Sequence, residues 1–182
     1  ILIFLISLIS FVGYFSIIGF ETKKFNNQIN DKLKEKNKDF DLELSKIKLI
    51  LNPFKFEINA KTFGTKLKHK DKALDFEYIQ TKISLKSLIE NEFSLINFKA
   101  STKSLEIKNF ISFIQSLNNS AELFIFKKLI KNGYLIADIS FNFDEKGNLK
   151  NDFKIKGFVT DTKINFIQKY EVKNLNFIFD LN

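Results

Sequence analysis

Hydrophobic and polar residues alternate along most of the chain with the period of two that is typical of a half-buried β-strand. Strands are predicted over 40–44, 46–51, 54–60, 62–68, 74–86, 93–100, 103–108, 135–143, 149–158 and 172–181. Near Ser45 the apolar parity slips by one residue, which predicts a β-bulge. Turn residues such as Asn52-Pro53 and Lys70-Asp71-Lys72 separate the strands, so antiparallel hairpins are expected, the clearest turning at 144–148.

Two helical segments interrupt these strands. Apolar spacing predicts a helix near 109–117, and Asn118-Asn119-Ser120 offers a start for another over 121–132. Gly133 suits the left-handed residue that follows a helix. The last strand stops without a turn, so the sheet is expected to continue beyond residue 182. The segment 38–182 is thus predicted to be α+β and mainly antiparallel β, with two or three short helices in the fold as a whole.

The first twenty residues, ILIFLISLISFVGYFSIIGF, differ from the rest because they carry no charge. A helix of that length rises about 30 Å, which matches the hydrocarbon thickness of a bilayer. No small-residue cleavage pattern precedes Glu21, so we expect a retained transmembrane anchor over 1–20, with a cleaved signal peptide as the alternative. Phe25, Ile29 and Leu33 then recur every four positions, which predicts a juxtamembrane amphipathic helix over 21–37.

The formal net charge of +8 changes this picture little. The chain has 29 Lys and no Arg, and its abundance of Lys, Asn, Ile and Phe is typical of A/T-rich codons. A phosphate-reading surface would favour Arg, whereas here Lys alternates with Asp, Glu and Asn between apolar positions. We therefore expect a solvated strand face and no nucleic-acid partner.

Residues that carry chemistry are few. There is no Cys, and the single His69 lies among lysines, which indicates an exposed loop residue without a metal or catalytic role. Asp39, Asp41 and Glu43 form the polar side of one strand, and no glycine-rich phosphate loop or nucleophile motif occurs. The sequence indicates neither an enzyme nor a metal or other cofactor.

Several segments together resemble the N-terminal region of the AsmA-like family of Gram-negative envelope proteins. The segments are the apolar N-terminal run, FDLEL at 40–44, LNPFKF at 51–56, SLKSLIENEFSL at 84–95, KSLEI at 103–107 and KNGYLIADI at 131–139. The likeness covers nearly the whole chain, although family members are usually far longer.

The resemblance implies an elongated, curved β-groove that carries phospholipid. It also implies a single-pass anchor in the inner membrane and a groove in the periplasm. The expected lining of the groove is Phe40, Leu42, Leu44, Leu49, Leu51, Phe54, Phe56, Ile58, Ile83, Leu85, Phe141, Phe143, Phe177 and Phe179. Lys23 and Lys24 are expected at the membrane surface, where they would attract anionic headgroups.

Other interpretations stay open. Single-sequence periodicity fits a closed β-sandwich or a compact α+β core as well as a groove. A membrane-anchored structural or outer-membrane assembly factor that contacts other envelope proteins by strand addition fits the same pattern. An envelope sensor domain is the third class, although no output module is visible.

Overall fold

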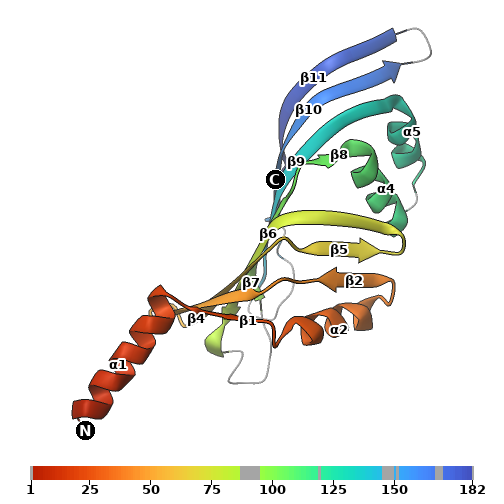
Figure 1. Ribbon diagram of the computed structural model, residues 1–182. Coiled ribbons are helices and arrows are strands. Elements are labelled where there is room, and N and C mark those ends of the chain that lie inside the picture. The colour runs from red at the N-terminus through yellow and green to blue at the C-terminus, as the bar shows by residue number, and fades with distance from the viewer. Residues whose placement is uncertain are drawn as a thin grey trace.

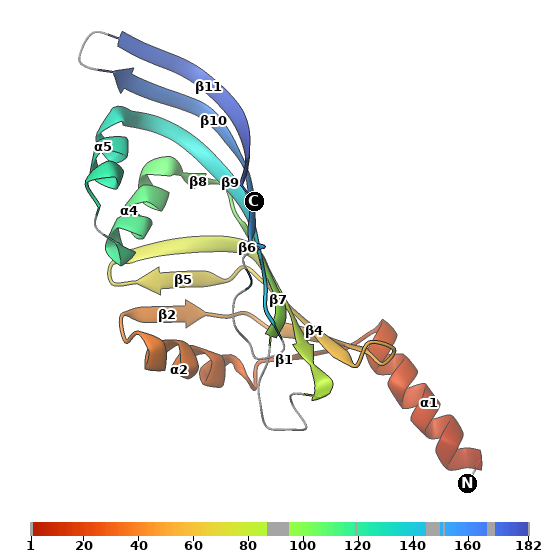
Figure 2. The same ribbon diagram turned by 180° about the vertical axis from the view of Figure 1, so that it is seen from behind.

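The fold is an open, curved, mainly antiparallel sheet with helices placed mostly on one side (Figures 1 and 2). The computed structural model describes residues 2–86, 95–118, 120–144, 150, 152–166 and 170–181. The strands are β1 (Phe20–Thr22), β2 (Phe40–Glu43), β3 (Ile47–Asn52), β4 (Glu57–Phe63), β5 (Lys66–His69), β6 (Lys72–Ser84), β7 (Leu95–Thr102), β8 (Leu105–Glu106), β9 (Ile130–Asn142), β10 (Lys154–Phe166) and β11 (Tyr170–Leu181). These strands confirm the predicted mainly antiparallel class.

The strands form one main path with a short branch. The main path runs β1-β3-β4-β6-β7-β9-β10-β11, and every pairing along it is antiparallel. The branch is β2, which pairs with β5, and β5 in turn pairs with the first part of β6. The predicted hairpin between β9 and β10 is confirmed, although residues 145–148 of its predicted turn lie outside the described residues.

Four helices accompany the sheet in the described part of the chain. They are α1 (Leu2–Ile17), α2 (Asn26–Lys36), α4 (Ile107–Leu117) and α5 (Ala121–Leu129). Strands β9 to β11 arch over α4 and α5, which lie side by side beneath them (Figure 1). Both predicted internal helices are therefore present, and the Ser120 hydroxyl accepts a hydrogen bond from the Leu123 amide at the start of α5.

Gly133 is not the helix cap that its position suggested. Helix α5 ends at Leu129, and Gly133 lies inside β9 with φ +133°. A Cβ atom there would lie 2.5 Å from Thr162 Oγ1 and 2.8 Å from Ile107 Cδ1. The glycine is therefore needed for the close approach of β9 to β10 and α4, at the point where the β9–β10 register shifts.

The N-terminal elements are shorter than predicted. Helix α1 ends at Ile17, and the chain turns at Gly19, which has φ +70°. Residues 20–22 form β1 and pair with β3, so the helix predicted over 21–37 begins only at Asn26. Within the described residues, the structure contains no helix with both the length and the apolar character required to cross a membrane.

The parity slip near Ser45 has another cause than the predicted β-bulge. Residues 44–46 belong to no strand, and they carry the chain from β2 in the branch to β3 in the main path. The Asn26 side-chain amide donates hydrogen bonds to the carbonyl oxygens of Leu44 and Ser45, at 3.0 and 2.8 Å. The slip therefore marks a change of pairing partner.

His69 is buried, in contrast to the exposed loop position predicted for it. It ends β5, is 3% exposed, and its ring centroid lies 4.7 Å from that of Phe40. Its Nδ1 atom lies 2.8 Å from Ser116 Oγ on α4, within hydrogen-bond distance. The alternation of the strand turns Leu67 and His69 inward, and the lysine-rich sequence masked this pattern.

Candidate functional site

The apolar face of the main sheet is continuous from its first strand to its last. In antiparallel pairs, residues directly opposite one another point to the same face, and neighbouring strands lie about 4.8 Å apart. One row of opposite residues, the long row, crosses all eight strands of the main path. The long row is Thr22, Ile47, Thr62, Ile79, Ala100, Ile139, Ile155 and Leu181. It therefore extends about 34 Å across the sheet.

A second row on the same face contains aromatic side chains. This aromatic row is Phe20, Leu49, Ala60, Thr81, Phe98 and Phe141. The rings of Phe98 and Phe141 stack with their centroids 6.2 Å apart. Two residues away from the aromatic row in each strand, Leu51 of β3 lies opposite Ile58 of β4, and Ile58 lies opposite Ile83 of β6. Every residue in these rows is apolar or a threonine, so the rows present no charge to a ligand.

This apolar face has two parts that differ in what covers them. The covered half is the set of buried strand residues Phe76, Ala100, Leu135, Ala137 and Val159, which pack in clusters with Ile107, Ile111 and Phe113 of α4. The open half is the set Leu49, Leu51, Ile58, Ile83 and Phe141, which are half-buried and belong to neither cluster. Phe20, Phe177 and Leu181 at the two edges of the same face are 42%, 43% and 53% exposed, so apolar surface for a ligand remains over the open half and at both edges.

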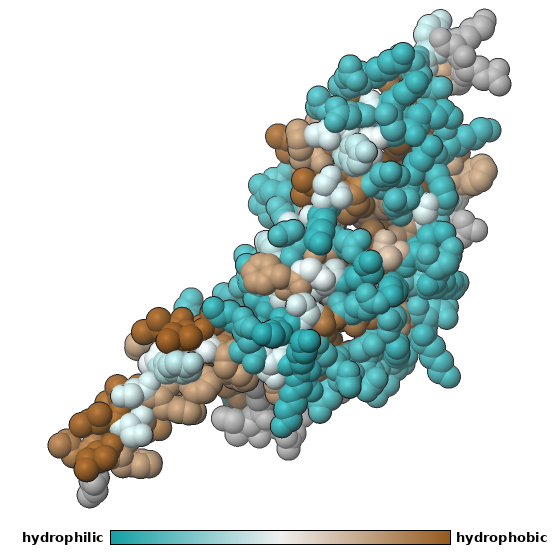
Figure 3. Space-filling view, viewed as in Figure 1, coloured by the Kyte–Doolittle hydropathy of each residue, from teal (hydrophilic) through white to brown (hydrophobic). Residues whose placement is uncertain are grey.

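The open half is joined to the apolar surface of α1. Helix α1 buries none of its residues, and Figure 3 shows its side chains as a mainly hydrophobic extension from a largely hydrophilic surface. The Phe15 and Phe20 ring centroids lie 5.4 Å apart, and Phe20 is paired with Leu49 of the open half. A Cβ atom at Gly19 would collide with the Leu49 carbonyl oxygen, so the turn holds α1 close to β3.

The structure brings half of the predicted lining together on this face. Leu49, Leu51, Ile58, Ile83 and Phe141 form the open half. Phe177 and Phe179 lie on the same face of β11, opposite Val159 and Gly157, and Phe179 packs against the α4 cluster. These seven positions fit an apolar surface that crosses the sheet.

Most of the other predicted lining residues lie elsewhere. Phe40 packs against the cluster under α4, and Leu42 lies opposite Leu67 in the branch. Leu44 is in the segment between β2 and β3. Phe54 and Phe56 occupy the turn before β4 and are 95% and 69% exposed, so the predicted strand start at 54 is wrong. Leu85 follows β6 and donates its amide hydrogen to the Phe56 carbonyl. Phe143 directly follows β9, two residues after Phe141, and its amide donates to the Ile96 carbonyl.

Sequence reasoning missed three residues on this face. Phe20 was assigned to the anchor, although it begins β1. Phe98 and Ile139 lie in strands that were predicted, but the facing strand was not identified. The period of two at 95–102 gave a usable signal for Phe98, whereas the pairing partners of a strand depend on tertiary structure.

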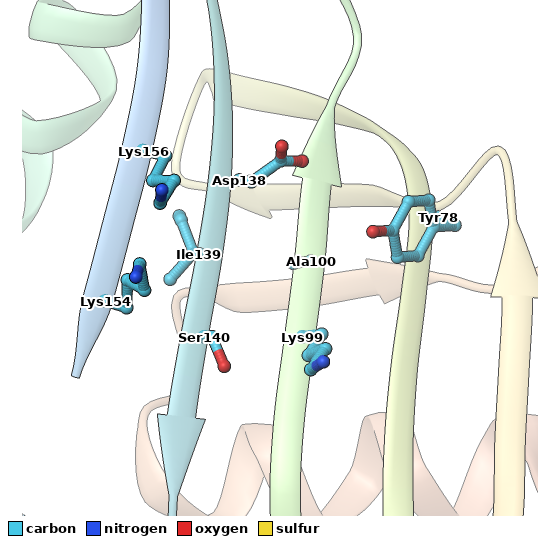
Figure 4. Close-up of a pocket in the computed structure, with 8 residues that line it drawn as sticks. All are labelled: Tyr78, Lys99, Ala100, Asp138, Ile139, Ser140, Lys154 and Lys156. Atoms are coloured by element: carbon cyan, nitrogen blue, oxygen red, sulfur yellow. The ribbon is translucent and has the colours of Figure 1, made fainter. Parts of the chain in front are cut away.

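The opposite face of the sheet carries polar chemistry. Figure 4 shows the residues around a depression there: the side chains of Tyr78, Lys99, Asp138, Ser140, Lys154 and Lys156 belong to this face, whereas Ala100 and Ile139 in its lining also belong to the long row of the apolar face. Lys99 and Lys154 flank Ser140 across the strands. Lys156 lies 2.9 Å from Asp180, whose hydrogen bond raises the pKa of Lys156. The described part of the chain contains no group of three or more His, Asp or Glu placed to hold a metal ion.

Lys23 and Lys24 are exposed in the turn between β1 and α2. The Lys24 amide donates a hydrogen bond to Thr22 Oγ1 at 3.0 Å, which orders this turn. Both ammonium groups are therefore available to solvent or to an anionic surface beyond the end of β1.

Comparison of the chain with protein-family models, curated proteins and solved structures gave no match. The fold and the site alone therefore define the class: an open, curved antiparallel sheet with one apolar face that is partly covered by helices and is joined to an apolar N-terminal helix. The resemblance to the AsmA-like family stays a prediction.

Proposed function

We propose that the protein binds phospholipid at a membrane to which α1 attaches it. In this proposal α1 enters the bilayer, and the open half of the apolar face holds acyl chains. The observation that carries the proposal is the contact of Phe15 with Phe20, because it connects the apolar helix to the aromatic row of the sheet. An acyl chain that leaves the bilayer beside α1 would meet apolar side chains at each strand it crossed.

The size and chemistry of the open half support this role. Its side chains are aliphatic or aromatic, and each is only half-buried. A methylene that is fully removed from water gains about 0.8 kcal/mol, and one that lies on an open face with its outer side in solvent gains part of that. The rows supply no fixed charge, so they select for apolar chains and leave the headgroup to solvent or to nearby lysines. Binding and transfer, rather than catalysis, is the activity that such a surface supports.

The cellular setting is part of the same proposal. By its resemblance to the AsmA-like family, the protein is proposed to sit in the inner membrane with its sheet in the periplasm and to pass phospholipid toward the outer membrane. The open, curved antiparallel sheet is compatible with a groove of that kind. Lys23 and Lys24 would then contact headgroups close to α1.

Photocrosslinking in membranes tests the lipid proposal. A benzophenone side chain placed at Leu51, Ile58 or Ile83 should form phospholipid adducts. Ile50 and Asn59 are matched controls, because they lie opposite each other on the same two strands but point to the other face. Adducts at the open half with none at the controls are expected. Equal yields at both faces, or none at the open half, would exclude the lipid-binding surface.

Strand addition is a second candidate function, and the free edge of β11 in the described residues favours it. Among the described residues, β11 pairs only with β10, so its other edge presents unpaired backbone groups along Tyr170–Leu181. A partner's strand could extend the sheet there, as in an envelope assembly factor. Crosslinkers in β11 would then yield adducts with protein, whereas the lipid proposal expects lipid adducts from β3, β4 and β6.

A further inference from the structure

Helix α5 and the adjacent ends of β10 and β11 lie at the end of the molecule opposite α1 (Figures 1 and 2), and they carry a second group of exposed apolar side chains. We call it the tip. The tip consists of Phe124, Ile125 and Phe126 of α5, Phe166 at the end of β10, and Tyr170 and Val172 at the start of β11. These six side chains are between 40% and 74% exposed. Helix α5 contacts β10, and exposed apolar residues on neighbouring elements can together form an interaction surface.

Strand register places the two parts of the tip on the same side of the sheet. Ile130 follows α5 directly and packs against the cluster beneath that helix. Ile130 of β9 lies opposite Ile164 of β10, and Ile164 lies opposite Val172 of β11. Two residues nearer the end of the β10–β11 hairpin, Phe166 lies opposite Tyr170. Residues two apart in a strand share a face, so Phe166 and Tyr170 emerge on the side that carries α5.

The tip is bordered by lysines that have no acidic partner in the described part of the chain. Lys127 and Lys128 lie in the last turn of α5, and Lys131 follows two residues after its end. The Lys131 ammonium donates to the Lys128 carbonyl oxygen at 3.1 Å, so its charge is held at the helix end. By contrast, Lys163 and Lys173 both pair with Glu171.

We propose that the tip docks peripherally on a bilayer that contains anionic phospholipid. Aromatic and aliphatic side chains beside lysines fit the boundary between headgroups and acyl chains, where the rings enter the interface and the ammonium groups meet phosphate. The unpaired positive charge argues for an anionic lipid surface rather than for a neutral protein partner. This contact adds to the proposed role of α1 and does not depend on lipid binding by the open half.

The absence of Trp from the sequence allows a direct test. The Phe126→Trp variant of the full chain carries a single indole at the tip, and Phe124→Trp provides a second reporter if the first disturbs folding. The protein is first inserted into phosphatidylcholine vesicles, and protein-free vesicles with phosphatidylglycerol and brominated acyl chains are then added. We expect a blue shift and quenching of Trp emission that require phosphatidylglycerol and weaken with salt.

Charge-reversal variants of the Trp-containing protein test whether the lysines beside the tip attract the anionic vesicles. Reversal at Lys127→Glu and Lys128→Glu should weaken binding of the added vesicles roughly tenfold or more. The matched control reverses Lys99 and Lys154, which lie on the polar face of the sheet in Figure 4 and change the net charge equally. The control should bind as the parent does.

Three results would overturn the docking proposal: no change in emission, equal binding to vesicles of phosphatidylcholine alone, or equal losses in the two charge variants. A concentration-dependent blue shift without vesicles would instead identify a second copy of the chain as the occupant. Crosslinking from Leu51 measures the open half separately, so failure of one proposal is distinguishable from failure of the other.

Discussion

The covered and open halves belong to one face of one sheet, yet only one of them is a closed core. Leu135 in the covered half is 5% exposed, whereas Leu51 in the open half is half-buried. Both are leucines in antiparallel strands, and both lie on the apolar side of an alternation. The difference between them therefore comes from the helices above the sheet and not from the strands themselves.

The position of the helices in the chain explains which half is covered. Helices α4 and α5 lie between β8 and β9, and α4 packs its buried Ile107, Ile111 and Phe113 onto the strands next to that connection. Helix α2 lies close to β3 in sequence but contacts β2 in the branch. Its anchors there are polar: the Asn30 side chain accepts a hydrogen bond from the Leu42 amide and donates one to Asp41.

Truncating a leucine in each half should give the largest contrast. Leu135→Ala leaves a cavity beneath α4 and should lower the free energy of unfolding by about 2–5 kcal/mol. Leu51→Ala removes a side chain that is only partly buried and is covered by no helix cluster, so it should cost about 1 kcal/mol. Urea unfolding of the full chain in detergent measures both. If the two variants lost equal unfolding free energy, the open half would be as well covered in solution as the covered half, and the two halves would not differ.

Glycine substitutions sharpen the same comparison at the backbone. Gly133→Ala combines a positive φ with a clash against Thr162 and Ile107, so it should destabilise the covered half by about 2–3 kcal/mol. Gly64→Ala is the matched control, because Gly64 also has a positive φ but open space around its Cβ position. It should cost only about 1 kcal/mol. Thermal unfolding should rank the two variants in that order, and a larger effect at Gly64 would contradict the packing argument.

The hydrogen bond between His69 and Ser116 tests how firmly α4 is held. Ser116→Ala leaves a buried ring nitrogen without its partner, which should cost about 1–2 kcal/mol. Ser112→Ala is the control on the same helix, since its hydroxyl bonds only the Lys108 carbonyl oxygen of α4 itself. Its effect on the unfolding free energy should be close to zero. Similar effects of the two variants would show that the contact to β5 does not stabilise the cover.

Local patterns predicted the presence of most strands but not their bounds or partners: β10 runs over Lys154–Phe166 instead of 149–158, and the strand predicted over 103–108 gives way to α4 at Ile107. The alternation at 135–143 and 149–158 identified the β9–β10 hairpin, because both strands and their turn are contiguous. The slip at Ser45 was a real signal, but a change of partner and a bulge look alike in a single sequence. Phe54 and Phe56 fit an alternation that begins too early, since nothing local separates the turn after Pro53 from the strand that follows.

The candidate site was predictable to the extent that it depends on alternation. Ile58 and Ile83 were identified, and the structure pairs them directly. Phe20 and His69 were misassigned because neighbouring residues dominated the interpretation: an uncharged run in one case and a lysine-rich segment in the other. The division into covered and open halves required the position of α4, which no local pattern contains.

The smallest effect concerns the polar attachment of α2, in contrast to the apolar attachment of α4. Hydrogen bonds from Lys34 and from Asn30 lower the pKa of Asp41 below its usual value of 3.8. The charged carboxylate therefore stabilises the α2–β2 contact above that pH, and the stabilisation is lost as the pH falls through the lowered value. Because the pair is partly exposed, it contributes only a few tenths of a kcal/mol.

Asp41→Asn should thus be slightly less stable than the parent at neutral pH and equal to it in acid. NMR titration of the Asp41 carboxyl should give a midpoint below 3.8, and an unshifted midpoint would show that α2 is not held by this contact.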